Sequence, residues 1–126
     1  MKACFPVVLF AFVGSGVLAQ SAPQPVKLPE PRRQSAMSVE AALWARQSVR
    51  TLAPDSITLA DMGQLLWAAQ GVNRANGHRT APSAMAAYPL ELYLVASRVS
   101  GLPAGVYHYG VVGHVLEPVL SGDRLR

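Results

Sequence analysis

The 126-residue chain contains a single cysteine, Cys4, close to its N-terminus. One cysteine cannot form a disulfide within the chain and cannot supply a cysteine-rich metal site. The three histidines, His78, His108 and His114, are not spaced as metal ligands are. Pairs of Asp and Glu close enough for a carboxylate site are also missing. We therefore expect no metal centre and no cysteine chemistry.

Charged residues are scarce as well, at 14% of the chain, and the formal net charge is +4. A nucleic-acid-binding surface requires clustered basic residues interleaved with aromatic ones. Apart from the pair Arg32-Arg33, the arginines of this chain are scattered. We therefore expect no nucleic-acid partner.

Only one long apolar run is present, and it lies within residues 1–19. Lys2 precedes the run, small residues break it, and Ala19 completes a pattern typical of a signal-peptide cleavage site. The run is too short to cross a membrane, which favours a secretory signal over the alternative of a buried N-terminal helix. Cys4 lies before the run, so a lipid anchor is not expected. These features predict Sec-type export, cleavage near Ala19 and no stable membrane anchor.

Residues 20–37 are rich in proline and carry few side chains that could be buried. This composition predicts an extended, polyproline-like leader that is poorly ordered. Such a segment serves either as a spacer or strap across a partner subunit, or simply as a tail.

Two helices are predicted after the leader. Ser38 is a suitable N-cap for the first, which we expect over residues 38–49 because apolar residues recur there at helical spacing. The second is expected over residues 59–70, where Thr58 to Asp61 resembles a capping box. Gly71 stands where a left-handed C-cap belongs.

The rest of the chain is predicted to form strands. A polar loop at 72–80 and a helical turn at 82–88 come first. Alternating and β-branched residues then predict three strands, at 90–97, 106–111 and 115–119. Residues 121–123 are expected to begin another helix. Helices followed by strands predict an α+β domain over residues 38–126.

Two segments carry residues suited to binding an anion. Arg46 and Arg50 would share one face of the first helix, where two guanidinium groups converge on an anion with the Ser48 hydroxyl beside them. In the second segment, residues 79–84, small residues after Pro82 would let backbone N–H groups approach a ligand. Alone, the first segment is more typical of a solvated helix face and the second of an ordinary loop.

Several motifs in this order change that interpretation. They are Arg46-Gln47-Ser48-Val49-Arg50, Leu65-Leu66-Trp67-Ala68-Ala69-Gln70-Gly71, Arg79-Thr80-Ala81-Pro82-Ser83-Ala84, Tyr88-Pro89-Leu90-Glu91-Leu92-Tyr93-Leu94-Val95 and Gly105-Val106-Tyr107-His108-Tyr109. Together they resemble the nitroreductase family, and within it the SagB/ThcOx-type dehydrogenases. The resemblance covers residues 40–126, approximately. The sequence departs from the family pattern at Met85 and Ala86, where relatives often have glycine or asparagine.

The resemblance implies an FMN-binding α+β fold that works as an intertwined homodimer, with each flavin at the subunit interface. Arg46 and Ser48 would contact the phosphate end of the flavin, and Arg50 the pyrimidine edge of its ring. The flavin would carry a hydride from a nicotinamide or other small-molecule donor, so no protein nucleophile is required.

The loop of the second segment would approach the same flavin from the partner subunit. The residues concerned are Pro82, Ser83 and Ala84. Family domains continue for roughly another hundred residues, a typical length for a small domain. The chain is therefore expected to form the N-terminal part of the fold, two helices and then a short, mostly antiparallel sheet.

Two functions remain open from the sequence. One is an FMN-dependent oxidoreductase that transfers a hydride through the flavin, either as a homodimer or with a complementing chain. The other is a truncated, non-catalytic fragment that acts as a partner-binding subunit.

The N-terminal pattern makes a first testable prediction. Export should remove residues 1–19, because Ala19 follows the apolar run at the spacing of a signal-peptidase site. Mass spectrometry of the exported protein should find Gln20 as its first residue. An exported chain that keeps Lys2 would contradict this.

Overall fold

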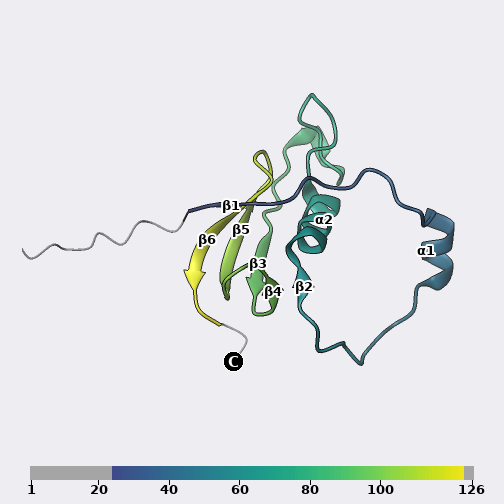
Figure 1. Ribbon diagram of the computed structural model, residues 1–126. Coiled ribbons are helices and arrows are strands. Elements are labelled where there is room, and N and C mark those ends of the chain that lie inside the picture. The colour runs from purple at the N-terminus through teal and green to yellow at the C-terminus, as the bar shows by residue number, and fades with distance from the viewer. Residues whose placement is uncertain (1–23, 124–126) are drawn as a thin grey trace, which may run out of the picture.

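The computed structural model describes residues 24–123. The predicted signal peptide and the first residues of the leader lie outside this range. Two helices and an antiparallel sheet make up the described chain, which confirms the predicted α+β class. Figure 1 shows α2 packed beside the sheet, while α1 lies apart from both.

The helix α2 spans Leu59–Gln70, as predicted. Its N-terminus is capped by Thr58, whose hydroxyl oxygen accepts a hydrogen bond from the Asp61 N–H at 3.1 Å. The same hydroxyl donates to the Asp61 carboxylate at 2.7 Å. The two residues thus form reciprocal hydrogen bonds at the start of the helix, where backbone N–H groups lack helical partners. Gly63, Leu66 and Gln70 form its buried face.

The C-terminus of α2 differs from the prediction. Gly71 is the C-cap, but its φ of −67° and ψ of 152° are extended rather than left-handed. A glycine is needed there for space, because a Cβ atom would lie 2.1 Å from Cδ1 of Trp67. Trp67 lies over this position because its indole N–H donates to the Val72 carbonyl at 3.1 Å.

The main sheet has four strands in the order β1-β6-β5-β3, all antiparallel to their neighbours. The three predicted strands are present with shifted ends, as β3 (Tyr93–Ala96), β5 (Gly105–Gly110) and β6 (Val115–Ser121). The helix expected to begin at 121–123 is absent from the described residues, since Ser121 ends β6 and Gly122 has a φ of +91°. A second, two-stranded parallel sheet pairs β2 (Ile57–Thr58) with β4 (Val99–Ser100) and was not predicted.

The leader is ordered where the sequence predicts disorder. Its residues Val26–Lys27 form β1, paired with Leu116 and Val115 of β6. Leu28 is only 2% exposed, and its N–H donates to the His114 carbonyl at 3.1 Å. The prediction of a poorly ordered leader with little to bury is therefore wrong for residues 26–28. Pro25 and Pro29 bracket this stretch and, lacking N–H groups, limit it to a short strand.

The core lies between α2 and one face of the sheet. Side chains on β5 alternate, so Tyr107 and Tyr109 point inward and are 5% and 1% exposed. They pack with Leu66 of α2, Leu116 of β6 and Leu28 of the leader. The core therefore unites residues from nearly the whole described chain, from the leader to the last strand.

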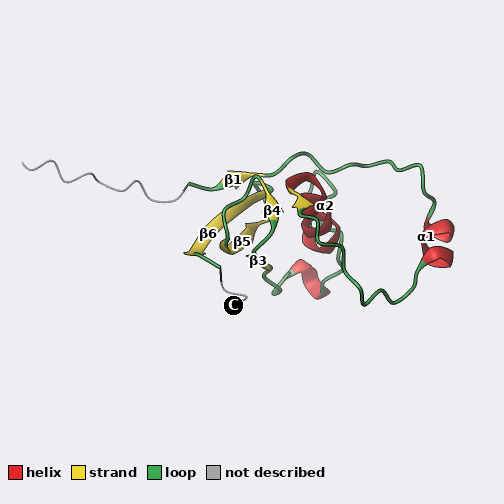
Figure 2. Ribbon diagram, turned by 60° about the horizontal axis from the view of Figure 1, so that its bottom comes forward, coloured by secondary structure: helices red, strands yellow, loops and turns green. Residues whose placement is uncertain are grey.

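The helix α1 spans Val39–Ala45 and is shorter than predicted. Ser38 caps it as expected, but the helix ends at Arg46, which has extended backbone angles. None of its residues is buried, and Figures 1 and 2 show it on an arc of chain away from the sheet. Short helices depend on tertiary packing for stability, so without a covered face the helix stops early. Arg46 and Arg50 consequently do not share a helical face.

The burial of Leu28 makes the second prediction. Leu28→Ala should lower the free energy of unfolding by about 2–5 kcal/mol, the range for large-to-small changes in a core. Leu52→Ala is the matched control, since Leu52 is 80% exposed. Urea unfolding of both variants measures the difference. Equal midpoints for the two variants would show that the leader contributes nothing to the core.

Candidate functional site

The predicted loop residues Pro82, Ser83 and Ala84 lie in a long connection between α2 and β3. The connection begins with a hairpin-like turn, closed by a bridge between Val72 and Arg79. It continues through a single 3-10 turn, η1 (Ala84–Ala86), where a helical turn was predicted. Ser83 precedes η1, and its hydroxyl oxygen accepts a hydrogen bond from the Tyr88 N–H at 2.8 Å. The loop therefore folds back on itself around Ser83.

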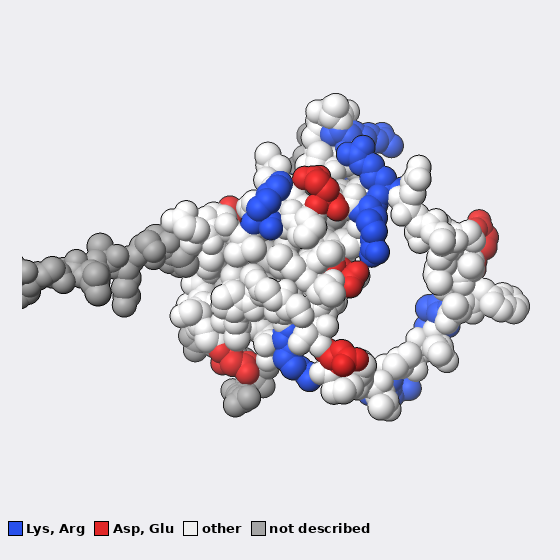
Figure 3. Space-filling view, viewed as in Figure 1, with Lys and Arg blue, Asp and Glu red and all other residues white. Residues whose placement is uncertain are grey.

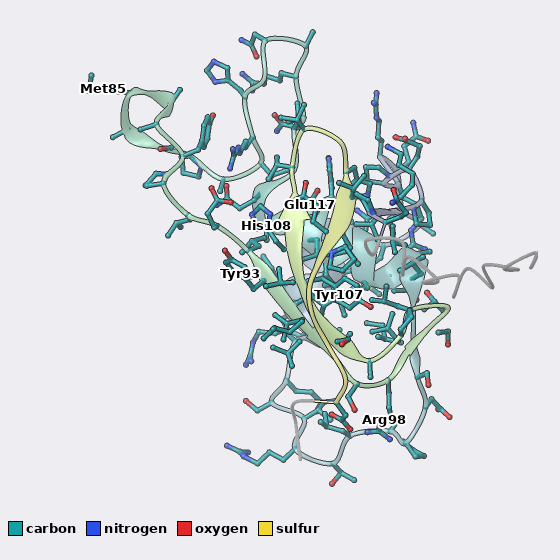
Figure 4. The ribbon with its side chains drawn as sticks, turned by 90° about the vertical axis from the view of Figure 1, so that its left-hand side faces the viewer. Met85, Tyr93, Arg98, Tyr107, His108 and Glu117 are labelled. Atoms are coloured by element: carbon teal, nitrogen blue, oxygen red, sulfur yellow. The ribbon has the colours of Figure 1, made fainter. Side chains whose placement is uncertain are left out.

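The backbone of this loop is strained. Met85 and Ala86 both have a φ of 54°, and Tyr88 has a φ of 44°. This left-handed region suits glycine and, to a lesser degree, asparagine, and it costs other residues of order 1–3 kcal/mol each. Met85 and Ala86 are the two positions where the resemblance described above leads us to expect glycine or asparagine. Figure 4 shows Met85 at the far tip of the loop, where its side chain is 99% exposed.

Arg79 fastens the loop to the body of the protein. Its guanidinium carbon lies 4.7 Å from the centre of the Tyr88 ring, and its backbone N–H donates to the Tyr88 hydroxyl at 3.2 Å. The guanidinium also donates to the side-chain oxygen of Gln70, at the end of α2, at 3.5 Å. The sequence analysis included Arg79 in the motif at residues 79–84 but did not predict its contact with Tyr88. The two residues are nine apart, a separation that matches neither helical nor strand periodicity.

A cavity of about 380 Å³ lies within this loop. Pro82 and Ser83 line it, together with three basic side chains, Arg74, His78 and Arg79. Ala84 is outside the lining, although it follows Ser83 directly. The cavity is therefore a basic hollow suited to an anionic or strongly polar group.

The second predicted set, Arg46, Ser48 and Arg50, lies in the exposed segment after α1. Within residues 24–123, these three side chains make no hydrogen bond and no ion pair, so their donors are available to a ligand. Figures 1 and 2 show that the arc carrying α1 lies well away from the loop before β3. In Figure 3, basic side chains on this arc are likewise separate from those on the main body. One copy of the chain does not bring the two sets together.

A buried polar network was missed by the sequence analysis. The Tyr109 hydroxyl and His114 Nδ1 are 2.7 Å apart, and His114 Nε2 lies 3.0 Å from the Pro29 carbonyl oxygen. A carbonyl only accepts, so Nε2 carries a proton, and in the neutral ring Nδ1 accepts a hydrogen bond from the Tyr109 hydroxyl. Burial raises the pKa of Tyr109, and the charge of Arg79 opposes that rise. Tyr109 and His114 also line a cavity of about 420 Å³ between the leader and the end of α2.

Metal sites and membrane-spanning helices are both absent from residues 24–123. No group of three or more His, Cys, Asp or Glu side chains there could hold a metal ion. No helix in that part of the chain is long and apolar enough to cross a membrane.

The chain is similar to proteins of a known family. Residues 43–124 match the model of the nitroreductase family. The chain belongs to the nitroreductase family. The matched range contains both candidate segments, residues 46–50 and 82–84, and it agrees with the resemblance expected from the motifs.

Individual relatives agree with this assignment. The crystal structure of a provisionally named nitroreductase from Ralstonia eutropha is 39% identical, with a TM-score of 0.65 over 78% of this chain. A provisionally named nitroreductase of Methanocaldococcus jannaschii is 38% identical over 87 residues, or 69% of this chain. The nitroreductase-like fold is thereby confirmed for the region covered. The chain spans 44% of the length of each of these two relatives.

The fold of the loop before β3 makes the third prediction. Ser83→Ala removes the oxygen that accepts from the Tyr88 N–H, a bond worth about 0.5–1.5 kcal/mol net. The Tyr88 amide should then exchange its hydrogen about two- to tenfold faster. Ser100→Ala, on β4, is the control and should leave that amide unchanged. Hydrogen exchange followed by NMR measures both, and equal rates in the two variants would show that Ser83 does not order the loop.

Proposed function

We propose that this nitroreductase-family chain is an FMN-binding subunit of an oxidoreductase of the SagB-type branch. The observation that carries the proposal is the family match over residues 43–124, because it includes both segments that the resemblance assigns to the flavin. When bound, FMN would supply hydride transfer between a nicotinamide or other small-molecule donor and an acceptor. The residues of the chain would bind the cofactor and place it.

The chemistry of the first segment fits the phosphate and ring edge of FMN. The guanidinium groups of Arg46 and Arg50 form no hydrogen bond or ion pair with any described residue, and Ser48 adds a hydroxyl donor. A guanidinium binds phosphate with two parallel N–H donors, which makes such contacts stronger than those between neutral groups. A fixed positive charge at the ring edge would also stabilise negative charge that accumulates there.

The second segment fits a flat ligand that lies close to the backbone. Ala84 is small and therefore leaves room for a close approach. Ser83 is held by its bond to the Tyr88 N–H. The cavity that Pro82 and Ser83 line opens beside this backbone.

We propose that two copies of the chain, or this chain and a complementing one, form each flavin site. The separation of the two segments within one copy supports this arrangement (Figure 2). The exposed apolar side chains of α1 support it as well, with Leu43 at 69% and Trp44 at 93% exposure. Large exposed apolar groups gathered on one element commonly mark an interface. The same observation favours the second candidate function, a non-catalytic partner-binding subunit.

We further propose that the protein acts after export.

The fourth prediction tests the flavin site. Arg46→Ala and Arg50→Ala should each weaken FMN binding roughly tenfold or more, because each removes charge-assisted bonds worth about 1.5–3 kcal/mol. Arg33→Ala removes an equally charged but leader-borne side chain and should leave the affinity unchanged. Titration of FMN fluorescence measures all three. Unchanged FMN affinity in both Arg46→Ala and Arg50→Ala would show that these arginines are solvated and do not contact the cofactor.

A complementation experiment separates the two candidate functions. A chain carrying both Arg46→Ala and Arg50→Ala is mixed with a chain carrying Ala84→Glu, which places bulk and negative charge in the loop. If the site takes its arginines from one copy and its loop from the other, each mixed dimer regains one intact site of two. FMN binding should then reappear in the mixture. A wild-type chain that self-associates but binds no FMN would support the partner-binding subunit instead.

A further inference from the structure

His108 lies between two carboxylates on the face of the sheet opposite the core. Its Nδ1 is 2.9 Å from Oε2 of Glu117, and its Nε2 is 2.8 Å from Oε2 of Glu91. The Tyr93 ring lies beside it, with ring centroids 5.2 Å apart. Figure 4 shows His108, Glu117 and Tyr93 side by side on neighbouring strands. Both nitrogens of one imidazole therefore face an acidic side chain.

The two carboxylates belong to parts of the fold that differ in how firmly they are held. Glu117 is on β6, directly opposite His108 in the β5–β6 register. Glu91 belongs to the segment that leaves the loop of Ser83 and leads into β3. The first backbone bond that ties this segment to the sheet is at Leu92, whose carbonyl accepts from the Tyr109 N–H at 2.9 Å. Among the contacts between this segment and the sheet, the one between Glu91 and His108 therefore lies nearest the loop.

The two contacts of His108 depend on its protonation. An ionised carboxylate only accepts hydrogen bonds, and a neutral imidazole carries one N–H, whereas an imidazolium carries two. Both carboxylates can therefore be satisfied together only by the protonated ring. In the neutral ring, one bare nitrogen faces a carboxylate oxygen and repels it. Glu117 is placed by the strand pairing, so the contact that opens is the one with Glu91.

We propose that His108 is a pH-dependent latch that holds the segment at Glu91, and with it the loop of Pro82 and Ser83, against the sheet. The groups that face His108 are Glu117 from β6, Glu91 from the segment before β3, and Tyr93 from β3. The latch follows from these contacts alone. Its effect on a flavin rests on the proposed function of the loop.

The direction of the pH dependence follows from the charges. The hydrogen bond with Glu117, then that with Glu91, raises the pKa of His108, and burial opposes this only in part. A group whose pKa is raised by folding stabilises the folded state below its ordinary value and loses that contribution as the pH rises through the raised value. The latch is therefore closed below the ordinary histidine pKa of about 6.5. It opens as the pH rises through the raised pKa.

The test is an NMR titration of the full chain without flavin, so its outcome does not depend on the proposed function. The pKa of His108 should lie above the ordinary value in the wild type and should fall in Glu91→Gln and in Glu117→Gln. Amide exchange at Tyr88, whose N–H is hydrogen-bonded to Ser83, corrected for intrinsic pH dependence, should become about two- to fivefold faster above that pKa, the range for a partly exposed ion pair. In Glu91→Gln, exchange should be fast at both pH values. Asp55→Asn is the control and should leave both measurements unchanged, since it neutralises a carboxylate that is exposed and outside both the latch and the loop.

Two results would overturn the latch. One is an ordinary pKa for His108 in the wild type. The other is an equal pH dependence of amide exchange at Tyr88 in the wild type and in Glu91→Gln, which would show that the loop responds to another group.

Discussion

A hydroxyl group buried in the core determines how the sheet, its last turn and the leader are joined. Tyr109 is 1% exposed, and a buried hydroxyl without a partner would cost about 1–3 kcal/mol. The hydroxyl is hydrogen-bonded to His114 Nδ1 at 2.7 Å, and His114 Nε2 donates to the Pro29 carbonyl at 3.0 Å. The left-handed backbone of His114, with a φ of 48°, forms part of the β5–β6 turn. One chain of hydrogen bonds therefore runs from the central strand to the leader, and it places Leu28 in the core beside Gly63.

The alternation of β5 divides the sheet into two faces with different roles. Tyr107 and Tyr109 point to α2 and close the core, while His108 points to the other face. There it meets the acidic side chain of Glu117 and the one that precedes β3, Glu91. The same strand thus stabilises the fold through one face and couples the loop before β3 to the sheet through the other.

The candidate site is divided between two parts of the molecule of unequal rigidity. The loop around Ser83 is held by side-chain hydrogen bonds, by the stacking of Arg79 on Tyr88, and by its attachment to α2. The segment from Arg46 to Arg50 follows a helix with no buried residue. Available basic donors and exposed apolar side chains therefore lie in the same region.

Local interactions were predictable from the sequence. The boundaries of α2 follow from its capping residues and apolar spacing, and three strands follow from their alternation. The motif order identified the nitroreductase family. These features are encoded within a few neighbouring residues, which is why they can be recognised without the fold.

Only the tertiary structure decided the rest, because it depends on residues far apart in the sequence. Proline content predicted a disordered leader, yet the edge of β6 and the chain of bonds through His114 order residues 26–28. Gly71 was expected to have a left-handed backbone, but its backbone is extended. A glycine is needed there because the Trp67 ring leaves no room for a side chain. The length of α1 was overestimated because periodicity cannot show whether a helix face is covered. The meeting of Glu91, His108 and Glu117 required the strand register, which brings together three residues that no sequence spacing connects.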